Sequence, residues 1–281
     1  MKLLIQHIVQ SLLGGVGLVW LFLEPYYGLM NIVPSKRIGF VGFLAIGIIC
    51  GVAWFLIDGL LVSGFLKRSI EITSNAFDTS VKVLFGDLFA QDGLKAISVN
   101  EFFDSTVDGD HVSENSLHGV MLKTYWGGNT ADWDKQVMEE LKNTQLVDVM
   151  SNRPAPGKLN RYPIGTTAKI STNGHDFLCV AIARTDTITL QASASSDDLN
   201  KALRGLLSKA RITCSGHALN IPLMGSGLAR TGIKPNIIVD LILLAIFEES
   251  KQHKITNEIR IILPKNMRKI IDLSTIQKDW R

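Results

Sequence analysis

The sequence predicts an α/β protein, a three-layer α/β/α sandwich with a mixed sheet, preceded by a transmembrane helical hairpin. Charged residues are nearly absent from residues 1–66 and common in the rest of the 281-residue chain. The same leading region contains two long uncharged stretches. Beyond residue 68, short β-rich runs alternate with amphipathic runs of helical length, which is the pattern of strands and helices layered on one mixed sheet.

The strongest single signal is the uncharged run from Ile38 to Ile57. As a helix it spans about 30 Å, the thickness of the hydrocarbon core of a bilayer. A buried core helix is the alternative for this run. The stretch from Leu3 to Leu23 is also uncharged, and its alternative is a cleaved signal peptide. No A-x-A-like site follows it, and a second span comes soon after, so a helical hairpin is favoured.

Residues 1–68 are therefore expected to form two transmembrane helices, at about 3–23 and 38–60, and residues 69–281 to form one soluble domain. Two spans place both ends of the chain on the same side of the membrane. The lysines and arginines that flank the hairpin favour the cytoplasmic side only slightly over the opposite loop.

Small residues recur at a spacing of four in both helices. Ser11 with Gly15, and Gly47 with Gly51, are small-x-x-x-small pairs that allow helix backbones to approach closely in lipid. These faces are expected either to pack the hairpin or to join protomers. Glycine is also simply common in membrane helices.

Composition excludes two classes of function. The chain has 29 Lys and Arg against 26 Asp and Glu, so it lacks the basic excess that nucleic-acid binding requires. Its cysteines, Cys50, Cys179 and Cys214, are widely spaced and include no C-x-x-C pair. We therefore expect neither a structural zinc site nor a disulfide framework, which fits a reducing compartment.

The soluble part is expected to alternate strands and helices along the chain. The predicted strands are Val81–Phe85, Ala96–Val99, Tyr162–Ile170, Phe177–Ala183, Ala218–Leu223 and Glu258–Leu263. The predicted helices are Ser116–Tyr125, Trp133–Leu141, Asp197–Lys209, Asn236–Ser250 and one that begins near Lys265.

Three strand ends carry the residues of a nucleotide pocket, because ligands bind outside the carboxyl ends of strands in such sheets. Asp87 follows the first strand and can accept hydrogen bonds from an exocyclic amine. Asn100 ends the second strand. The later loop from Pro222 to Gly232 is rich in glycine and can turn backbone N–H groups toward a phosphate ahead of the next helix. Each feature alone is more often a plain turn, and the combination favours a nucleotide.

Several of these residues resemble a known family. Lys82-Val83-Leu84-Phe85-Gly86-Asp87-Leu88 looks like the opening strand of macro domains, in which the aspartate meets the adenine amino group. Asn100 stands where those domains carry an asparagine facing the distal ribose, and the loop Gly225–Gly232 resembles their second phosphate-binding loop. A more detailed likeness is to the macro variant fused to two transmembrane helices in Thoeris anti-phage defence. It is carried by Asn100-Glu101-Phe102-Phe103-Asp104, Ser116-Leu117-His118-Gly119, Tyr162-Pro163-Ile164-Gly165-Thr166 and Pro222-Leu223-Met224-Gly225-Ser226-Gly227.

The resemblance implies a set of ligand-binding residues, and the residues leave alternatives open for several of them. Glu101 and Asp104 either meet an amine-bearing part of the ligand or are exposed carboxylates at a helix start. His118 is a contact or helix-start residue rather than an acid or base, and Tyr162 is expected in the core rather than the pocket. The full set is Asp87, Leu88, Asn100, Glu101, Asp104, Ser116, Leu117, His118, Gly119, Gly225, Ser226, Gly227, Leu228 and Arg230.

The resemblance also implies the function. It predicts an effector of antiviral defence in the inner cell membrane, a multi-pass protein with its macro domain in the cytoplasm. This domain would bind an NAD-derived ADP-ribose-type signal made by a TIR-domain enzyme, and the resemblance implies histidine-ADP-ribose as its form. The protein would then form homo-oligomers and disrupt the membrane. The ligand is an ADP-ribose derivative, and no cofactor, metal or nucleic acid is expected.

The sequence departs from macro domains that hydrolyse ADP-ribose conjugates. Those domains usually carry an Asn-Ala-Ala-Asn stretch and a Gly-Gly-Gly loop, where this chain has Asn-Glu-Phe-Phe-Asp and Ser-Leu-His-Gly. We therefore expect binding without turnover and no catalytic residue. The alternatives are a membrane-bound ADP-ribosyl hydrolase and a structural membrane anchor whose sandwich binds protein.

Overall fold

The structure is a computed structural model that describes residues 2–62, 64, 66–73, 78–225 and 231–280. The chain divides into two compact units. One comprises residues 1–68 with 272–275, and the other comprises residues 69–271 with 276–281.

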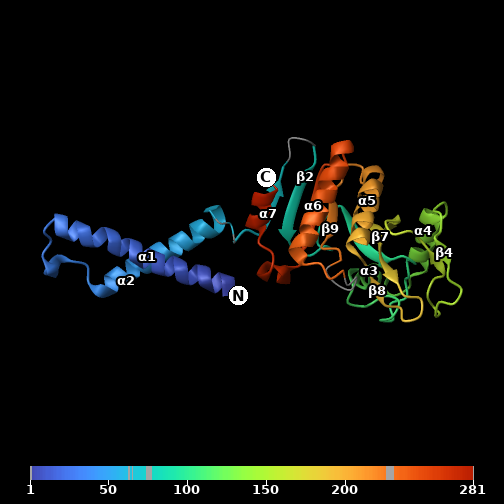
Figure 1. Ribbon diagram of the computed structural model, residues 1–281, viewed down its shortest axis with the longest axis horizontal. Helices are drawn as coiled ribbons and strands as arrows, with labels where there is room; N and C mark the ends of the chain where they lie inside the picture. Colours follow the sequence, from blue (N-terminus) through green and yellow to red (C-terminus); the bar gives the residue numbers. More distant parts are fainter. Residues whose placement is uncertain (1, 63, 65, 74–77, 226–230, 281) are drawn as a thin grey trace. The chain divides into compact units, whose positions relative to one another are not determined.

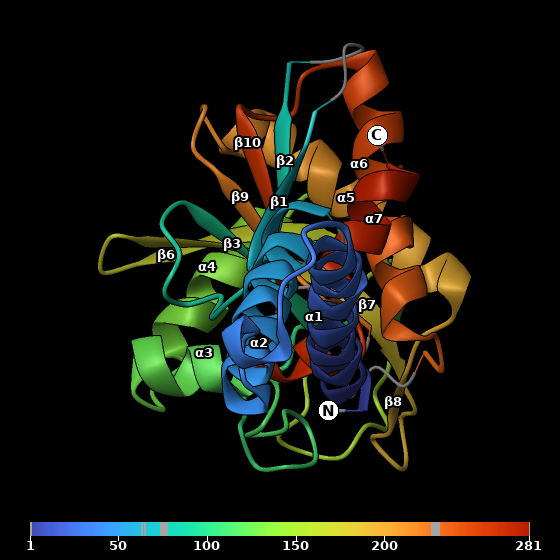
Figure 2. The same cartoon turned by 90° about the vertical axis from the view of Figure 1, so that its left-hand side faces the viewer.

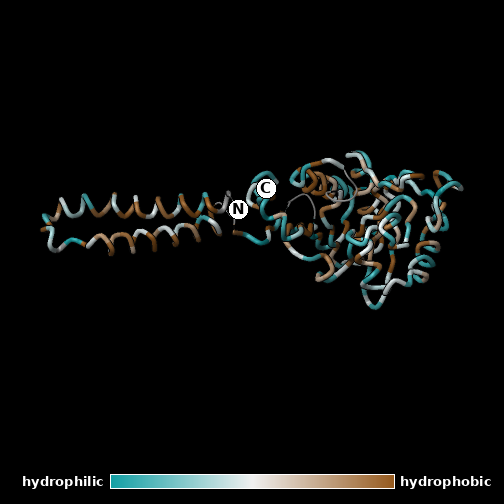
Figure 3. The backbone as a smooth tube through the Cα atoms, turned by 90° about the horizontal axis from the view of Figure 1, so that it is seen from below, coloured by the Kyte–Doolittle hydropathy of each residue, from teal (hydrophilic) through white to brown (hydrophobic). Residues whose placement is uncertain are grey.

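The first unit is a helical hairpin. Helix α1 (Lys2–Leu29) and helix α2 (Phe40–Ile57) are joined by a loop that contains the short 3-10 helix η1 (Pro34–Lys36), and α2 continues into the π-helical turn η2 (Asp58–Val62). Both helices are long and apolar enough to cross a membrane, and apolar residues dominate both in Figure 3. Helix α1 continues to Leu29, past the predicted end at Leu23, with Pro25 inside the helix.

The small residues of the two helices pack against each other. A Cβ added at Gly15 would lie 2.4 Å from the backbone nitrogen of Gly51 and 2.5 Å from the carbonyl oxygen of Gly47. One added at Gly51 would lie 2.8 Å from the carbonyl oxygen of Ser11. Both small-x-x-x-small pairs are therefore used inside the hairpin, which is the first of the two roles predicted for them.

The second unit is built on one mixed sheet, ordered β1-β2-β10-β9-β3-β7-β6, with β8 paired to β7. Strands β2, β10, β9, β3 and β7 run parallel, whereas β1, β6 and β8 are antiparallel to their neighbours. The strands are β1 (Ser69–Ile72), β2 (Ser80–Phe85), β3 (Leu94–Asn100), β6 (Thr167–Thr172), β7 (His175–Thr185), β8 (Ala192–Ser193), β9 (Leu219–Pro222) and β10 (Glu258–Leu263).

Helices cover both faces of this sheet (Figure 1). In Figure 2, α3 and α4 lie together on one side of the strands, and α5 and α6 lie on the other. The helices are α3 (Leu117–Trp126), α4 (Ala131–Leu141), α5 (Ser196–Thr213), α6 (Pro235–Gln252) and α7 (Leu273–Asp279), with the 3-10 helix η3 (Lys265–Lys269). A separate two-stranded ribbon pairs β4 (Asp148–Val149) with β5 (Asn160–Arg161). The predicted α/β/α sandwich is confirmed.

The side chains of β7 point alternately to the two faces of the sheet, which accounts for the three layers. Its residues Phe177, Cys179 and Ala181 join the core formed with α3 and α4. The intervening residues Leu178 and Val180 are equally buried and point to the opposite face, since successive side chains of a strand alternate. Both faces of this strand are therefore covered, as its continuous apolar run indicates.

The predicted elements are largely confirmed, and Glu258–Leu263 has the predicted bounds. The predicted strand Tyr162–Ile170 is wrong in its first half. The strand begins at Thr167, because Pro163 and the turn that follows it, closed by the Thr166 N–H to the Pro163 carbonyl, interrupt pairing. The predicted C-terminal helix near Lys265 is a 3-10 turn followed by α7.

Candidate functional site

The strand ends at which the site is expected lie along one edge of the sheet. Strands β2, β10, β9 and β3 are neighbours and parallel, so their carboxyl ends lie at the same edge. Adjacent strands are about 4.8 Å apart, so the ends of β2 and β9 are separated by about 10 Å and those of β2 and β3 by about 14 Å. This spacing suits an extended nucleotide diphosphate laid across the strand ends.

Asp87 follows β2 and is exposed. Its Oδ1 accepts a hydrogen bond from the backbone N–H of Phe89 at 3.0 Å, which closes a local turn. Burial raises the pKa of the neighbouring Tyr125 hydroxyl, and the negative charge of Asp87 adds to the rise. Leu88 is buried in the core beside this turn, so its side chain supports the loop.

The loop after β9 leads into α6. Gly225 has a φ of +82°, a conformation that glycine adopts without strain, and its carbonyl accepts a hydrogen bond from the Thr231 hydroxyl at 2.8 Å. The Thr231 side chain thus closes the base of the loop just ahead of Pro235, the first residue of the helix. Ser226, Gly227, Leu228 and Arg230 lie outside the described residues.

Asn100 binds its own loop. Its Oδ1 accepts from the backbone N–H groups of Phe102 and Asp104, each at 3.2 Å, and its Nδ2 donates to Asp104 Oδ2 at 2.7 Å. Asn100 therefore stabilises its own turn, which is the alternative to a contact with the distal ribose. Its contact with a ligand stays a prediction.

Glu101 is 1% exposed and holds three strand ends together. Its Oε1 accepts from the backbone N–H of Thr185 at the end of β7 at 3.2 Å. Its Oε2 pairs with the Arg161 guanidinium at 2.9 Å. The alternative of an exposed carboxylate at a helix start is therefore wrong for this residue.

Asp104 is the centre of a buried ionic cluster. Its two oxygens accept from both terminal nitrogens of Arg153, at 2.7 and 2.5 Å. Its Oδ1 also accepts from the backbone N–H of Lys158 at 2.9 Å. Asp104 and Arg153 are both almost fully buried, and the guanidinium also lies over the Phe102 ring. An exposed carboxylate is again excluded, and the cluster fixes the loop after β3, because one partner alone would be an uncompensated buried charge.

Ser116, Leu117, His118 and Gly119 begin α3. The Ser116 hydroxyl caps the helix by accepting from the Gly119 N–H at 2.9 Å. Gly119 is required there, since a Cβ would lie 2.2 Å from the carbonyl oxygen of Ser113. Leu117 is 38% exposed, so it is the side chain of this segment that faces outward.

His118 is buried against Trp133, with ring centroids 5.4 Å apart. Its Nε2 has no hydrogen-bond partner among the described residues. Burial lowers the pKa of the imidazole to about 3, and the positive charge of Lys158 adds to this effect. The neutral ring is unsuited to acid or base catalysis near neutral pH, in line with its predicted role as a contact or helix-start residue.

Comparisons with known proteins extend these observations. The family model described as "Thoeris protein ThsA, Macro domain" matches residues 81–264. The Thoeris protein ThsA of Bacillus amyloliquefaciens (strain Y2) is 23% identical over 259 residues, which is 88% of this chain and 85% of that protein. The chain belongs to the ThsA macro-domain family.

A solved structure shows the same fold. The Oceanobacillus iheyensis macrodomain with ADP aligns with a TM-score of 0.50 and 10% identity, covering 76% of this chain and 95% of that one. The same macrodomain with MES bound aligns with a TM-score of 0.49 and 11% identity, covering 75% and 94%. The family match spans β2 to β10, so it includes every strand end described above.

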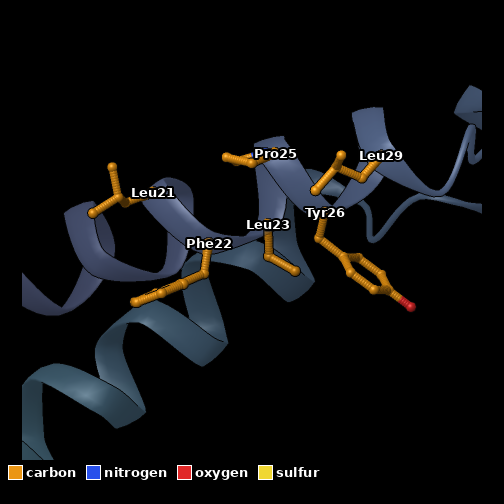
Figure 4. A pocket seen from close by; sticks show the side chains of 6 residues that line it. All are labelled: Leu21, Phe22, Leu23, Pro25, Tyr26 and Leu29. Atoms are coloured by element: carbon orange, nitrogen blue, oxygen red, sulfur yellow. The ribbon is translucent and has the colours of Figure 1, made fainter.

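Two surface hollows are lined by described residues, and neither lining includes a residue that follows β2, β3 or β9. One is on α1, lined by Leu21, Phe22, Leu23, Pro25, Tyr26 and Leu29 (Figure 4). Its lining is apolar apart from the tyrosine hydroxyl, so it lacks the polar groups that orient a nucleotide. The other is a charged hollow between α4 and β6. No cluster of metal-ligating residues occurs in the part of the chain that the structure describes.

The sequence did not predict the basic side chains that hold the loops of the macro domain in place. Arg153, Lys158 and Arg161 lie far along the chain from the groups they meet, in a segment with no periodic pattern. Tyr162, which is expected in the core, packs its ring edge-on against Phe103 at 5.5 Å. Local spacing could not have paired these residues, since only the tertiary fold brings them together.

Proposed function

We propose that this chain is a membrane-anchored effector of antiviral defence whose macro domain binds an NAD-derived, ADP-ribose-type signal. The hairpin lies in the inner cell membrane as two transmembrane helices, with the macro domain in the cytoplasm. The signal is made by a TIR-domain enzyme, and histidine-ADP-ribose is the form that the family resemblance implies. Binding promotes homo-oligomers that disrupt the membrane.

The observation that supports the proposal is that Asp87 and Gly225 follow parallel strands whose carboxyl ends lie at one edge of the sheet. Asp87 presents an exposed carboxylate whose Oδ2 is not used by the turn that binds Oδ1. This oxygen can accept from the exocyclic amine of adenine. The loop closed by Thr231 runs into the N-terminus of α6, where free N–H groups and the helix dipole favour a diphosphate. About 10 Å separates the two strand ends, a distance that an adenosine diphosphate can bridge.

Binding rather than turnover is favoured by the residues that follow β3 and begin α3. Asn100 uses its amide to hold the loop after β3, and His118 is buried and neutral. Glu101 and Asp104 are both engaged by cationic side chains. In this arrangement no titratable group among these residues is free to activate a water.

The test is calorimetric titration of the full-length protein in detergent micelles with ADP-ribose and its amino-acid conjugates. Asp87→Ala removes the adenine acceptor and is expected to weaken binding about 10- to 100-fold, the range for a hydrogen bond to a charged group. The matched control is Asp197→Ala at an exposed carboxylate on α5. Unchanged affinity of the Asp87→Ala protein for ADP-ribose would contradict the proposed nucleotide pocket.

The same samples separate the effector from the hydrolase. After each titration the ligand is recovered and identified by mass spectrometry. Intact ligand in stoichiometric amount supports a binding protein, and progressive cleavage of the conjugate supports the alternative ADP-ribosyl hydrolase.

A further inference from the structure

The turn that follows β10 carries a run of basic side chains. The 3-10 helix η3 has no acidic residue, and all three of its basic residues are exposed. None of the three forms an ion pair with an acidic side chain within the part of the chain that the structure describes. We call them the η3 cations: Lys265, Arg268 and Lys269.

The order of the sheet places η3 among the strand ends of the candidate nucleotide site. Strand β10 lies between β2 and β9 and runs parallel to both. Leu263 at the end of β10 is in register with Phe85 at the end of β2, and its carbonyl accepts a hydrogen bond from the Gly86 N–H at 2.9 Å. The chain enters η3 just beyond Leu263, so η3 starts between the strand ends that lead to Asp87 and to Gly225.

The position of Arg268 is fixed by an aromatic contact. Its guanidinium carbon lies 5.3 Å from the centre of the Phe85 ring. Phe85 is the last residue of β2 and leads through Gly86 into the turn that carries Asp87. Residues three apart in a 3-10 helix lie above one another, so Lys265 is on the same face of η3 as Arg268. This contact therefore holds the charge of Arg268 at the end of β2.

A diphosphate at these strand ends needs positive charge. The carboxylate of Asp87 repels a second anion placed beside it, and the start of α6 offers only the partial charges of its N–H groups. An arginine suits the task, because its planar guanidinium can donate to two phosphate oxygens at once. No ion pair of the η3 cations within the described residues has to be broken when a phosphate binds.

We infer that the η3 cations bind the diphosphate of the nucleotide ligand, with Arg268 as the principal contact. The guanidinium stays over the Phe85 ring and donates to the phosphate oxygens, while Lys265 and Lys269 add positive charge. The site thereby selects nucleoside diphosphates over uncharged nucleosides. This role rests on the proposed function, since it takes the strand ends as the nucleotide site.

The test is calorimetric titration of the full-length protein in detergent micelles with ADP-ribose, ADP and adenosine, each at low and at high NaCl. Arg268→Gln removes the charge, and Arg268→Lys keeps it. The matched control is Lys251→Gln, at an exposed lysine in the last turn of α6. Helix α6 begins at the strand-end edge and is 18 residues long, or about 27 Å, so this lysine lies far from the proposed contact.

Arg268→Gln should weaken binding of ADP-ribose and of ADP about 10-fold, the effect of one hydrogen bond to a charged group. Its affinity for adenosine should not change, because adenosine carries no phosphate. The affinity of the wild type for ADP-ribose should fall as salt is raised, since salt screens exposed charges. That fall should be smaller in Arg268→Gln and should be retained in Arg268→Lys and Lys251→Gln.

Equal ADP-ribose affinity and equal salt dependence in wild type and Arg268→Gln would overturn the role of the η3 cations and leave the proposed function standing. An equal loss of adenosine and ADP-ribose binding in Arg268→Gln would also overturn it, because the arginine would then act by holding Phe85 in place. Binding of ADP that depends on Arg268, without binding of ADP-ribose, would support the η3 cations and contradict the proposed ligand. A wild type that binds neither would overturn both.

Discussion

At the scale of single residues, His118 couples the fold to pH. Burial lowers the pKa of its imidazole to about 3, whereas a histidine in an unfolded chain titrates near 6.5. Below pH 6.5 this imidazole binds a proton in the unfolded chain but stays unprotonated in the folded protein. The contribution of the neutral imidazole to the free energy of unfolding is therefore fully present above about pH 6.5. It is lost as the pH falls below that value, by about 1.4 kcal/mol per pH unit.

His118→Gln should make the stability of the protein less sensitive to acid. Between pH 7 and pH 5 the wild-type free energy of unfolding should fall by about 2 kcal/mol more than that of the variant. Urea unfolding followed by tryptophan fluorescence at pH 7, 6 and 5 measures the difference, and His253→Gln, at an exposed histidine, is the matched control. An identical pH slope in wild type and His118→Gln would show that the imidazole is not kept neutral by burial.

At the scale of elements, α5 sits against the turn that precedes β6 through two glycines. A Cβ added at Gly205 would lie 2.0 Å from the carbonyl oxygen of Gly165, and one added at Gly165 would lie 2.7 Å from the carbonyl oxygen of Lys201. Gly165 has a φ of +94°, and its N–H donates to Ala181 of β7 at 2.9 Å. The turn is thus held by the sheet and cannot move away from the helix.

Gly205→Ala should force α5 away from the sheet and lower the free energy of unfolding by about 1–3 kcal/mol, as overpacking does elsewhere. The sign is informative, because alanine in an exposed helix interior would stabilise by about 1 kcal/mol. Urea unfolding measures the change, with Ser208→Ala on the exposed side of α5 as control. A stabilised Gly205→Ala protein would contradict the close approach.

The elements that the sequence predicts well are those with a regular pattern. The run Glu258–Leu263 alternates into a buried strand, and its predicted bounds are those of β10. Strand β1 was not predicted, because Ser69–Ile72 is only four residues long and follows the hairpin directly. Strands β4, β5 and β8 have two residues each, too few for any periodicity to appear.

At the scale of the whole molecule, the alignment of strand ends was predictable and the loop contacts were not. Strands that alternate with helices run parallel, so residues that follow them, such as Asp87 and Gly225, come to one edge. The Asp104–Arg153 pair joins positions 49 residues apart, and no local rule selects that partner among the basic residues of the chain. The edge follows from topology, and the shape of its loops follows from tertiary packing.

Association in the membrane and ligand binding should favour each other. If ADP-ribose promotes the homo-oligomers proposed above, oligomerisation must in turn tighten ADP-ribose binding by the same factor, since coupling free energies are reciprocal. The apparent Kd of full-length protein in vesicles should therefore fall as the protein-to-lipid ratio rises, by about 5- to 150-fold between the dissociated and associated limits. Titration at several protein-to-lipid ratios measures this change. A Kd that is constant across these ratios, in vesicles where cross-linking shows that the protein associates, would show that the signal acts on the membrane by a route other than oligomerisation.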